Sequence, residues 1–186
     1  MPSLLIAGSG GQGILFAGKL VAQAAIEEGM NVTWFPSYGA EVRGGTANCT
    51  VVISGGLIGS PVVSSPDILV VMNQASLERF GGKVKKDGII ILNSSVVGTM
   101  AKDKNKTPFL GRDIKVVEVP AGEIAYGMGA PLAANMVICG ALARAASICA
   151  FASMGRALKR LAPGGRPEVL AVNREALRRG WRYIGD

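Results

Sequence analysis

Histidine is absent from this 186-residue chain, and its three cysteines form no CxxC pair. Without histidine the chain cannot contain a serine–histidine or cysteine–histidine dyad, a histidine-ligated metal or a histidine proton relay. Three scattered cysteines cannot build a four-cysteine zinc or iron–sulfur site. We therefore expect no metal site and no covalent catalysis, and we interpret Cys49, Cys139 and Cys149 as buried thiols of a reducing, cytoplasmic compartment.

Charge is scarce as well. Charged residues make up 18% of the chain, against about 25% in typical soluble domains, whereas apolar residues reach 49%. A chain of this length fits one domain, residues 1–186, with a core of its own. The low charge favours a permanent protein partner that covers part of the surface, although a glycine- and alanine-rich monomer would have a similar composition.

Long uninterrupted apolar runs are missing. The first ten residues lack a basic start and reach glycine after a few apolar positions, so we expect no signal peptide. The longest apolar stretch, residues 132–153, contains Asn135 and Arg144 and is dense in alanine and glycine. It predicts a buried helix, and we expect no membrane partner.

The formal net charge of +7 is concentrated near the end of the chain. Residues 154–186 hold eight Lys/Arg and three Asp/Glu, and Arg174, Arg178 and Arg182 recur every four residues. This spacing is typical of one solvated helix face, and the block lacks the interleaved aromatic residues of a nucleic-acid surface. We expect no nucleic-acid partner; the alternative to a solvated face is a dock for an acidic partner subunit.

Short apolar runs alternate with helix-like stretches. The runs are typical of strands buried on both faces, and they occupy residues 3–7, 32–35, 47–54, 68–73 and 88–93, with a further strand within 114–125. This alternation predicts an α/β fold, a single doubly wound, mostly parallel sheet with helices on both faces, Rossmann-like in form. Residues 3–35 should form a strand–helix–strand unit with a right-handed crossover between parallel strands.

A glycine-rich turn follows the first predicted strand. Gly8, Gly10 and Gly13 satisfy the pattern GxGxxG between a strand and a helix. Glycines let backbone N–H groups approach a phosphate, and a helix N-terminus adds partial positive charge. A nicotinamide site also needs an acid at the end of the second strand, and that strand ends without one. A nucleotide site, a purely structural turn and a site for another phosphate-bearing ligand remain open.

A second glycine-rich segment, residues 36–48, should lie beside this turn, because ligands of doubly wound sheets bind at the carboxyl ends of the strands. Arg43, next to Gly44, offers a planar donor group for phosphate. Tyr38 can pack against a ring, and Asn48 can donate or accept a hydrogen bond. A loop packed on a neighbouring subunit is the alternative, and the two interpretations are compatible.

Several linked motifs in these segments resemble the gamma subunit of the 2-oxoacid:ferredoxin oxidoreductases. In chain order they read GSGGQGILFAGKL, FPSYGAEVRGGTANCTVVIS, IGSP, PDILVVMN, VPAGEIA and AANMVICGAL. The resemblance covers about residues 1–142, whereas the basic tail matches no motif of the family. The Arg-Gly-Gly form of the loop favours the 2-oxoglutarate and branched-chain types over the pyruvate type, and the indolepyruvate type remains open. Gly55 and Gly56 stand where family members often carry an acid.

The resemblance implies a complex that oxidatively decarboxylates a 2-oxoacid to an acyl-coenzyme A and passes electrons to ferredoxin. Thiamine diphosphate and [4Fe–4S] clusters would lie in partner subunits, alpha, beta and delta, which are separate chains or fusions. This chain would be non-catalytic, hold coenzyme A in a shared site and support the assembly. By analogy, the coenzyme would be bound by Gly8, Ser9, Gly10, Gly11, Gln12, Gly13, Tyr38, Arg43, Gly44 and Asn48.

Two other functions fit the same residues. A free-standing NAD- or FAD-dependent oxidoreductase would use the glycine turn for a dinucleotide, and an acyl-coenzyme A-binding module would use it without any assembly. Tight NADH binding by the isolated chain would favour the oxidoreductase.

Overall fold

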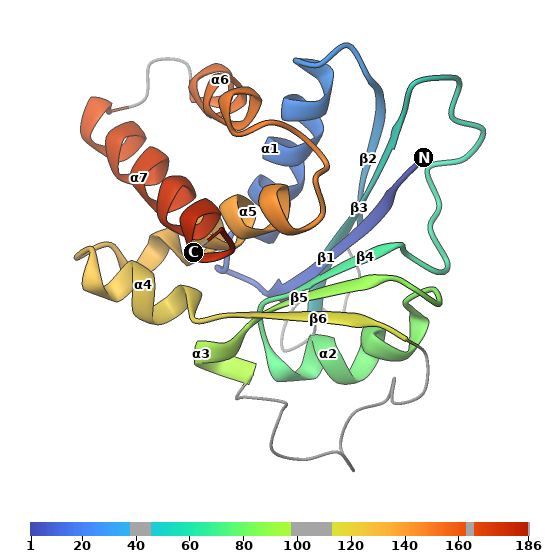
Figure 1. The fold of residues 1–186 in the computed structure, drawn as a ribbon, viewed down its shortest axis with the longest axis horizontal. Helices are drawn as coiled ribbons and strands as arrows, with labels where there is room; N and C mark the ends of the chain where they lie inside the picture. The colour runs from blue at the N-terminus through green and yellow to red at the C-terminus, as the bar shows by residue number, and fades with distance from the viewer. Residues whose placement is uncertain (38–45, 98–112, 163–165, 186) are drawn as a thin grey trace.

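A single six-stranded sheet forms the centre of the protein in the computed structural model, which describes residues 1–37, 46–97, 113–162 and 166–185 (Figure 1). The strand order is β2-β3-β1-β4-β5-β6. The strands are β1 (Ser3–Ser9), β2 (Asn31–Ser37), β3 (Thr46–Ser54), β4 (Ile68–Val71), β5 (Ile89–Asn93) and β6 (Lys115–Val119). The doubly wound α/β fold predicted from the sequence is confirmed, with one reversed strand.

Strand β3 is the reversed strand, and it lies between β1 and β2. It pairs antiparallel with both, whereas β1, β4, β5 and β6 run parallel to one another. The strands β1 and β2 are therefore parallel to each other, as expected for residues 3–35, but they are not neighbours in the sheet. The connection from β2 to β3 is too short for a crossover, so β3 returns antiparallel and separates the two.

Helices cover both faces of the sheet (Figure 1). One face is covered by α1 and α5, against which α6 and α7 pack in turn, and the other face packs against α2. No helix in the described part of the chain is long and apolar enough to cross a membrane. The helices are α1 (Ile14–Ile26), α2 (Gln74–Phe80), α3 (Ser94–Val97), α4 (Ala121–Gly127), α5 (Ala134–Ala145), α6 (Phe151–Leu161) and α7 (Pro167–Tyr183), with 3₁₀ turns η2 (Gly81–Lys83) and η5 (Pro131–Ala133).

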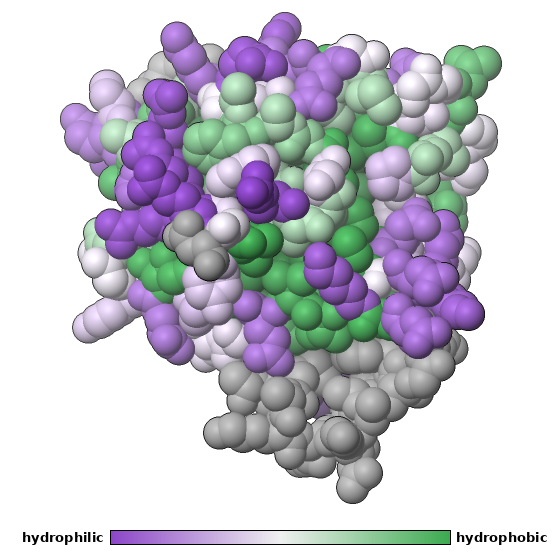
Figure 2. Space-filling view, viewed as in Figure 1, coloured by the Kyte–Doolittle hydropathy of each residue, from purple (hydrophilic) through white to green (hydrophobic). Residues whose placement is uncertain are grey.

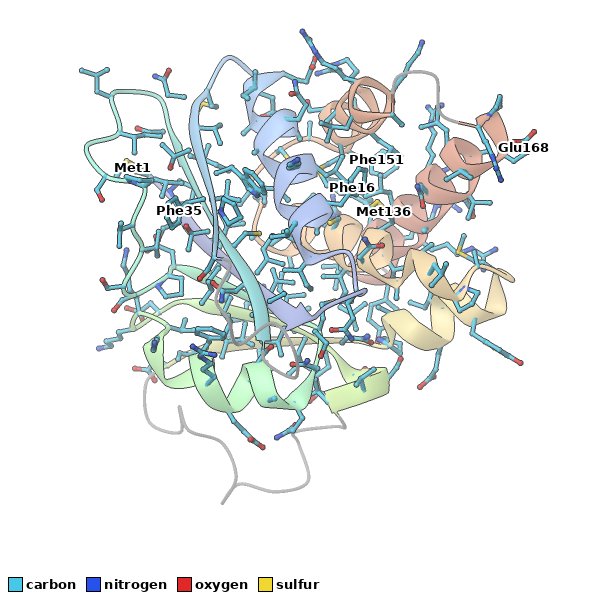
Figure 3. The ribbon with its side chains drawn as sticks, turned by 180° about the vertical axis from the view of Figure 1, so that it is seen from behind. Met1, Phe16, Phe35, Met136, Phe151 and Glu168 are labelled. Carbon is cyan, nitrogen blue, oxygen red and sulfur yellow. The ribbon has the colours of Figure 1, made fainter. Side chains whose placement is uncertain are left out.

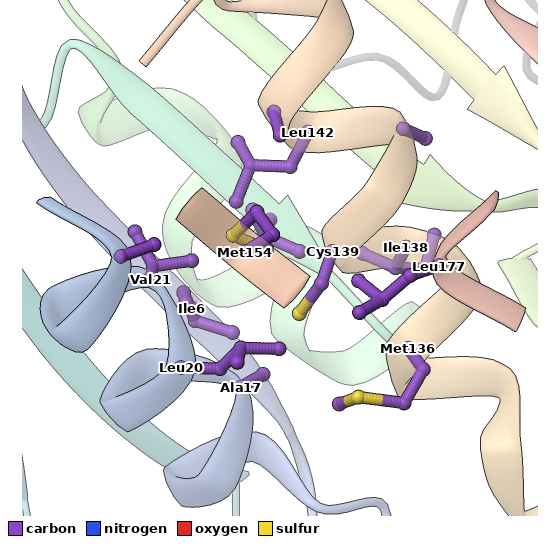
Figure 4. Close-up of a cluster of buried hydrophobic side chains, with 14 of the residues drawn as sticks. Ile6, Ala17, Leu20, Val21, Met136, Ile138, Cys139, Leu142, Met154 and Leu177 are labelled. Carbon is purple, nitrogen blue, oxygen red and sulfur yellow. The ribbon is translucent and has the colours of Figure 1, made fainter. Parts of the chain in front are cut away.

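The larger core lies between the sheet and the four helices of the first face. Leu20 of α1, Leu142 of α5 and Met154 of α6 are fully buried and converge there (Figure 4). The central strand β1 is buried on both faces. Burial on both faces explains why this strand appears in the sequence as a continuous apolar run instead of an alternating one.

The helices α5 and α7 cross with their backbones in contact. A Cβ atom at Gly140 would collide with the carbonyl oxygen of Leu177, and one at Gly180 would collide with the carbonyl oxygen of Val137. The side chain of Leu177 is itself fully buried. Two facing glycines thus fix the basic helix α7 to the core, a contact for which the sequence analysis had no prediction.

Candidate functional site

The glycine turn connects the carboxyl end of β1 to the first turn of α1, and β1 lies where the chain order of the sheet changes direction. Ligands of open α/β sheets bind at this position. No side chain caps the N-terminus of α1, and its first turn contains no acidic residue. Because the first backbone N–H groups of a helix have no partner within the helix, those of α1 face the turn unpaired and favour an anion.

The glycines of the turn fall into two kinds. Gly13 has a φ of 70°, and a Cβ there would collide with the amide of Asn135. A Cβ at Gly8 would lie 2.6 Å from the Gln12 side chain and 2.8 Å from Met72. By contrast, a Cβ at Gly10 would meet no atom of the described residues within 4 Å. Gly8 and Gly13 are therefore required by the protein's own packing, whereas Gly10 leaves space in front of the backbone.

Gln12 holds the turn in place. Its Oε1 accepts a hydrogen bond from the Ser9 N–H at 2.7 Å, and its Nε2 donates to the Met72 carbonyl at 3.0 Å. The side-chain amide is thus engaged by the protein on both sides, which ties the turn to the end of β4. The side chain of Gln12 thus positions the turn, and the predicted contact of Gln12 with the coenzyme stays a prediction.

Two asparagines that the sequence analysis did not assign to the site complete this frame. Asn73 donates from Nδ2 to the Ser9 hydroxyl at 2.5 Å and caps α2 by accepting from the N–H of Ser76 at 2.9 Å. Asn135 of α5 donates to the Gly13 carbonyl at 3.4 Å. An asparagine between a strand and a helix is a common N-cap, so the role of Asn73 had a visible signal. Asn135 had none, because it contacts Gly13 across 122 positions.

A cavity of about 350 Å³ opens in front of the turn. Neighbouring it, a second cavity of about 540 Å³ lies between the start of α5 and the first half of α7. Phe16 lines both, and it lies near Met136, which borders the second (Figure 3). The first cavity is lined by Ser9, Gly10, Gly11, Gly13, Ile14, Leu15, Phe16, Ser37 and Ala47.

The ends of the second glycine-rich segment lie where the sequence analysis expected them. Two described residues of this segment, Ser37 in β2 and Ala47 in β3, border the cavity at the glycine turn. Asn48 is not among the lining residues; it pairs with Ala7 and, because side chains alternate along a strand, lies on the opposite face from Ala47.

The other residues predicted from that segment fall outside the described part of the chain. They are Tyr38, Arg43 and Gly44. Their proposed contacts with a coenzyme stay predictions.

No carboxylate among the described residues borders this cavity. In a dinucleotide site the acid that binds the ribose stands at the end of the strand next to β1. Here the neighbour on that side is β3, which is antiparallel and begins at the cavity, and β2 ends one strand further away with Ser37. The described part of the site thus offers backbone amides at a helix start, without a carboxylate beside them.

The cysteines carry no reactive chemistry. All three are buried, and burial raises the pKa of Cys49 to about 11 and that of Cys149 to about 12; the pKa of Cys139 is raised further by the same cause. Their thiols stay protonated at neutral pH and are poor nucleophiles. The described residues also contain no group of His, Cys, Asp and Glu side chains that could hold a metal ion.

Comparisons with known proteins identify the family. Residues 3–183 match the family described as pyruvate ferredoxin/flavodoxin oxidoreductase. The ketoisovalerate oxidoreductase subunit VorA of Methanothermobacter marburgensis is 37% identical over 94% of this chain, which spans about a third (35%) of VorA. The 2-oxoglutarate synthase subunit KorC of Methanothermobacter thermautotrophicus is 34% identical over 95% of both chains.

Solved structures share the fold. The gamma subunit of a keto/oxoacid ferredoxin oxidoreductase from Geobacter sulfurreducens has a TM-score of 0.81 at 24% identity, covering 99% of this chain and 98% of that one. The 2-oxoglutarate:ferredoxin oxidoreductase from Magnetococcus marinus, solved with 2-oxoglutarate, coenzyme A and succinyl-CoA, has a TM-score of 0.83 at 23% identity; the match covers 99% of this chain and 31% of that one. With the family match and the curated relatives, the resemblance in the motifs is confirmed: the chain belongs to the pyruvate ferredoxin/flavodoxin oxidoreductase family.

Proposed function

We propose that this chain is the non-catalytic gamma subunit of a coenzyme A-dependent 2-oxoacid:ferredoxin oxidoreductase, and that its glycine turn binds phosphate groups of coenzyme A. The observation that carries the proposal is the open space in front of Gly10, beside the uncapped start of α1. Packing requires glycine at Gly8 and Gly13, but it does not require glycine at Gly10. A ligand that approaches the backbone closely accounts for a glycine at that position.

The residues of the turn fit the anionic end of this coenzyme. Backbone N–H groups at the start of α1 supply donors, and Gln12 and Asn135 hold the turn so that no rearrangement is needed on binding. No acidic side chain among the described residues borders the cavity to repel phosphate. When bound, coenzyme A supplies the thiol that takes up the acyl group; the chain's own contribution is to hold and orient it, since positioning alone can lower a barrier by up to about 7–11 kcal/mol.

A dinucleotide fits this site less well than coenzyme A. It would need a ribose-binding acid beside β1, and antiparallel β3 occupies that place without one. The related Magnetococcus marinus enzyme was solved with coenzyme A bound, which makes this coenzyme the first ligand to test.

The reaction centre and the remaining partners belong, in this proposal, to other chains. Thiamine diphosphate and [4Fe–4S] clusters would be held by alpha, beta and delta subunits or their fusions, and ferredoxin would accept the electrons in the cytoplasm. The 2-oxoacid would bind there too. The Arg-Gly-Gly loop and the named relatives of the ketoisovalerate and 2-oxoglutarate enzymes support one of these two substrate classes.

The test uses Gly10→Ala, because the added methyl group enters the cavity and meets no atom in the part of the chain that the structure describes. We expect the melting temperature of the variant to equal that of the wild type. We expect its dissociation constant for coenzyme A in the assembled complex to rise about tenfold, or 1.4 kcal/mol. Isothermal titration of the complex measures the constant, and the isolated chain and NADH are titrated alongside.

The control is Ala47→Ser, which adds one polar atom elsewhere in the same cavity wall and should change the affinity less than Gly10→Ala does. Unchanged affinity in the Gly10→Ala complex would remove the glycine turn from the coenzyme site. Tight binding of NADH by the isolated chain would replace the proposal with the free-standing oxidoreductase, and coenzyme binding without any copurifying subunit would replace it with an acyl-coenzyme A module.

A further inference from the structure

Helices α6 and α7 form a basic surface that the proposed coenzyme site does not use. Residues 151–185 contain eight Lys/Arg and two Asp/Glu. Hydrophilic side chains gather over these two helices in Figure 2. A surplus of this size on a chain with little charge elsewhere is a feature that a solvated face alone does not require.

Two carboxylates neutralise only part of this surface. Glu27 accepts from Arg160 at 3.2 Å and lies 3.7 Å from Arg156. Glu175 is shared in the same way by Arg178 at 2.6 Å and Arg179 at 3.1 Å. Each pair of guanidinium groups therefore keeps a positive charge in excess.

A groove of about 420 Å³ runs between the two helices on this surface. Lys159 of α6 and Arg174 of α7 line it, both are exposed, and neither forms an ion pair with a described carboxylate. Apolar atoms of Leu158, Leu170 and Ala171 also line it. The groove thus combines an apolar lining with unpaired cations at its border.

We propose that this groove binds an acidic, amphipathic segment of another subunit of the complex. Apolar side chains of such a segment would pack on Leu170 and Ala171, while its carboxylates would pair with Lys159 and Arg174. The apolar lining favours a protein segment over nucleic acid, because phosphates gain nothing from apolar contacts. The inference rests on the proposed assembly but not on the binding of coenzyme A.

A zero-length carbodiimide cross-linker tests this contact directly, because it joins a lysine amine only to a carboxylate that touches it. We expect the native complex, purified through a tag on this chain, to yield a cross-link from Lys159 to an Asp or Glu of another subunit, within a segment that also carries apolar residues. Acetylation of Lys159 should be at least tenfold slower in the complex than in the isolated chain. Lys115, exposed on β6, serves as the reference lysine.

Charge reversal gives an independent readout. We expect the double variant K159E/R174E to weaken association with the other subunits at least tenfold. The matched control K115E/R182E makes the same change in net charge at exposed positions outside the groove and should assemble as the wild type does. Equal melting temperatures of the isolated variants show that folding is unaffected.

Several results would overturn the proposal. A complex that forms with Lys159 still freely acetylated, or that tolerates K159E/R174E, would show that the groove is not the contact. A cross-link to a second copy of this chain would replace the partner with self-association. If the chain bound a 20-base-pair DNA duplex more tightly than it binds the other subunits, and K159E/R174E lost that binding, the partner of the groove would be nucleic acid. Absence of any copurifying subunit from the wild type would overturn this inference together with the proposed assembly.

Discussion

The glycine turn and the α5–α7 crossing both depend on glycine, but for different reasons. At the crossing, Gly140 and Gly180 each face a backbone carbonyl of the opposite helix, so any side chain would force the helices apart. At the turn, Gly13 is equally confined, whereas Gly10 borders empty space. Packing accounts for the glycines at the crossing and for Gly13, whereas Gly10 lacks such an explanation and stands beside the start of α1, where the proposed ligand would approach the backbone.

Among the variants that test this comparison, Gly180→Ala should have the largest effect on stability. The new Cβ would collide with the Val137 carbonyl, and neither backbone can rotate away as a side chain can. We expect the free energy of unfolding to fall by about 3 kcal/mol, the upper end of the usual cost of overpacking. Alanine's helix propensity, worth at most about 1 kcal/mol, is too small to compensate. Urea denaturation of the isolated chain measures the change.

Gly155→Ala is the matched control, since Gly155 also lies inside a helix but a Cβ there would meet no atom within 4 Å. Here only the propensity acts, so stability should stay the same or rise by up to about 1 kcal/mol. If Gly180→Ala were as stable as Gly155→Ala, the two helices would not be held at backbone contact.

A smaller effect is expected for Gly13→Ala at the turn. Its left-handed conformation costs an alanine about 1–2 kcal/mol, and its Cβ would also collide with Asn135. We expect a loss of about 2 kcal/mol in the free energy of unfolding together with weaker coenzyme binding. Gly10→Ala, by contrast, should lose affinity alone.

A double-mutant cycle separates the two causes at Gly13. Asn135→Ala removes the colliding amide, so G13A/N135A should be less destabilised than the sum of the single variants. Exact additivity, measured by urea denaturation, would show that backbone strain alone accounts for the loss and that Asn135 does not confine the turn.

Sequence patterns predicted the features of this molecule that depend on residues close together in the chain. β1 and β4 were visible as apolar runs because both faces are buried, and the start of α1 was visible because glycine precedes it. The place of β3 between β1 and β2 was not predicted, because apolar runs do not tell which strands pair. The facing of Gly140 and Gly180 joins residues 40 positions apart and has no local signature.

In the candidate site, too, some features could be predicted from the sequence and others could not. The position of the turn and its open amides followed from the spacing of Gly8, Gly10 and Gly13. The role of Gln12 did not, because a polar side chain in a glycine loop looks the same in sequence whether it faces a ligand or the Met72 carbonyl. Asn135 was noticed only as a polar residue in an apolar stretch; that it supports the turn depends on how α5 packs.

At the N-terminal end of β1 the fold is stabilised by a charged side chain, that of Asp67. Its contribution to the free energy of unfolding should depend on pH, whereas the contributions of the glycine contacts should not. Asp67 accepts hydrogen bonds from the Ser3 N–H at 2.8 Å, from the Ser3 hydroxyl and from Lys85 at 2.8 Å. Partial burial disfavours its carboxylate, but the hydrogen bonds from Lys85 and Ser3 outweigh this and lower its pKa. A lowered pKa in the folded state means that the carboxylate stabilises the fold above the pKa of the unfolded chain, about 3.9.

Asp67→Asn should therefore cost about 1 kcal/mol at pH 7, less than a fully buried charged hydrogen bond would, because 35% of the Asp67 side chain is exposed. The cost should shrink as the pH falls below about 4, where the unfolded chain takes up a proton, and vanish below the lowered pKa of the folded state, where the native carboxyl is protonated too. Urea denaturation at pH 7 and pH 3 measures both values, with Gly180→Ala as the reference whose loss is independent of pH. If the free energies of unfolding of Asp67→Asn and the wild type differed by the same amount at both pH values, packing and not charge would stabilise this end of the strand, as it does at the glycine contacts.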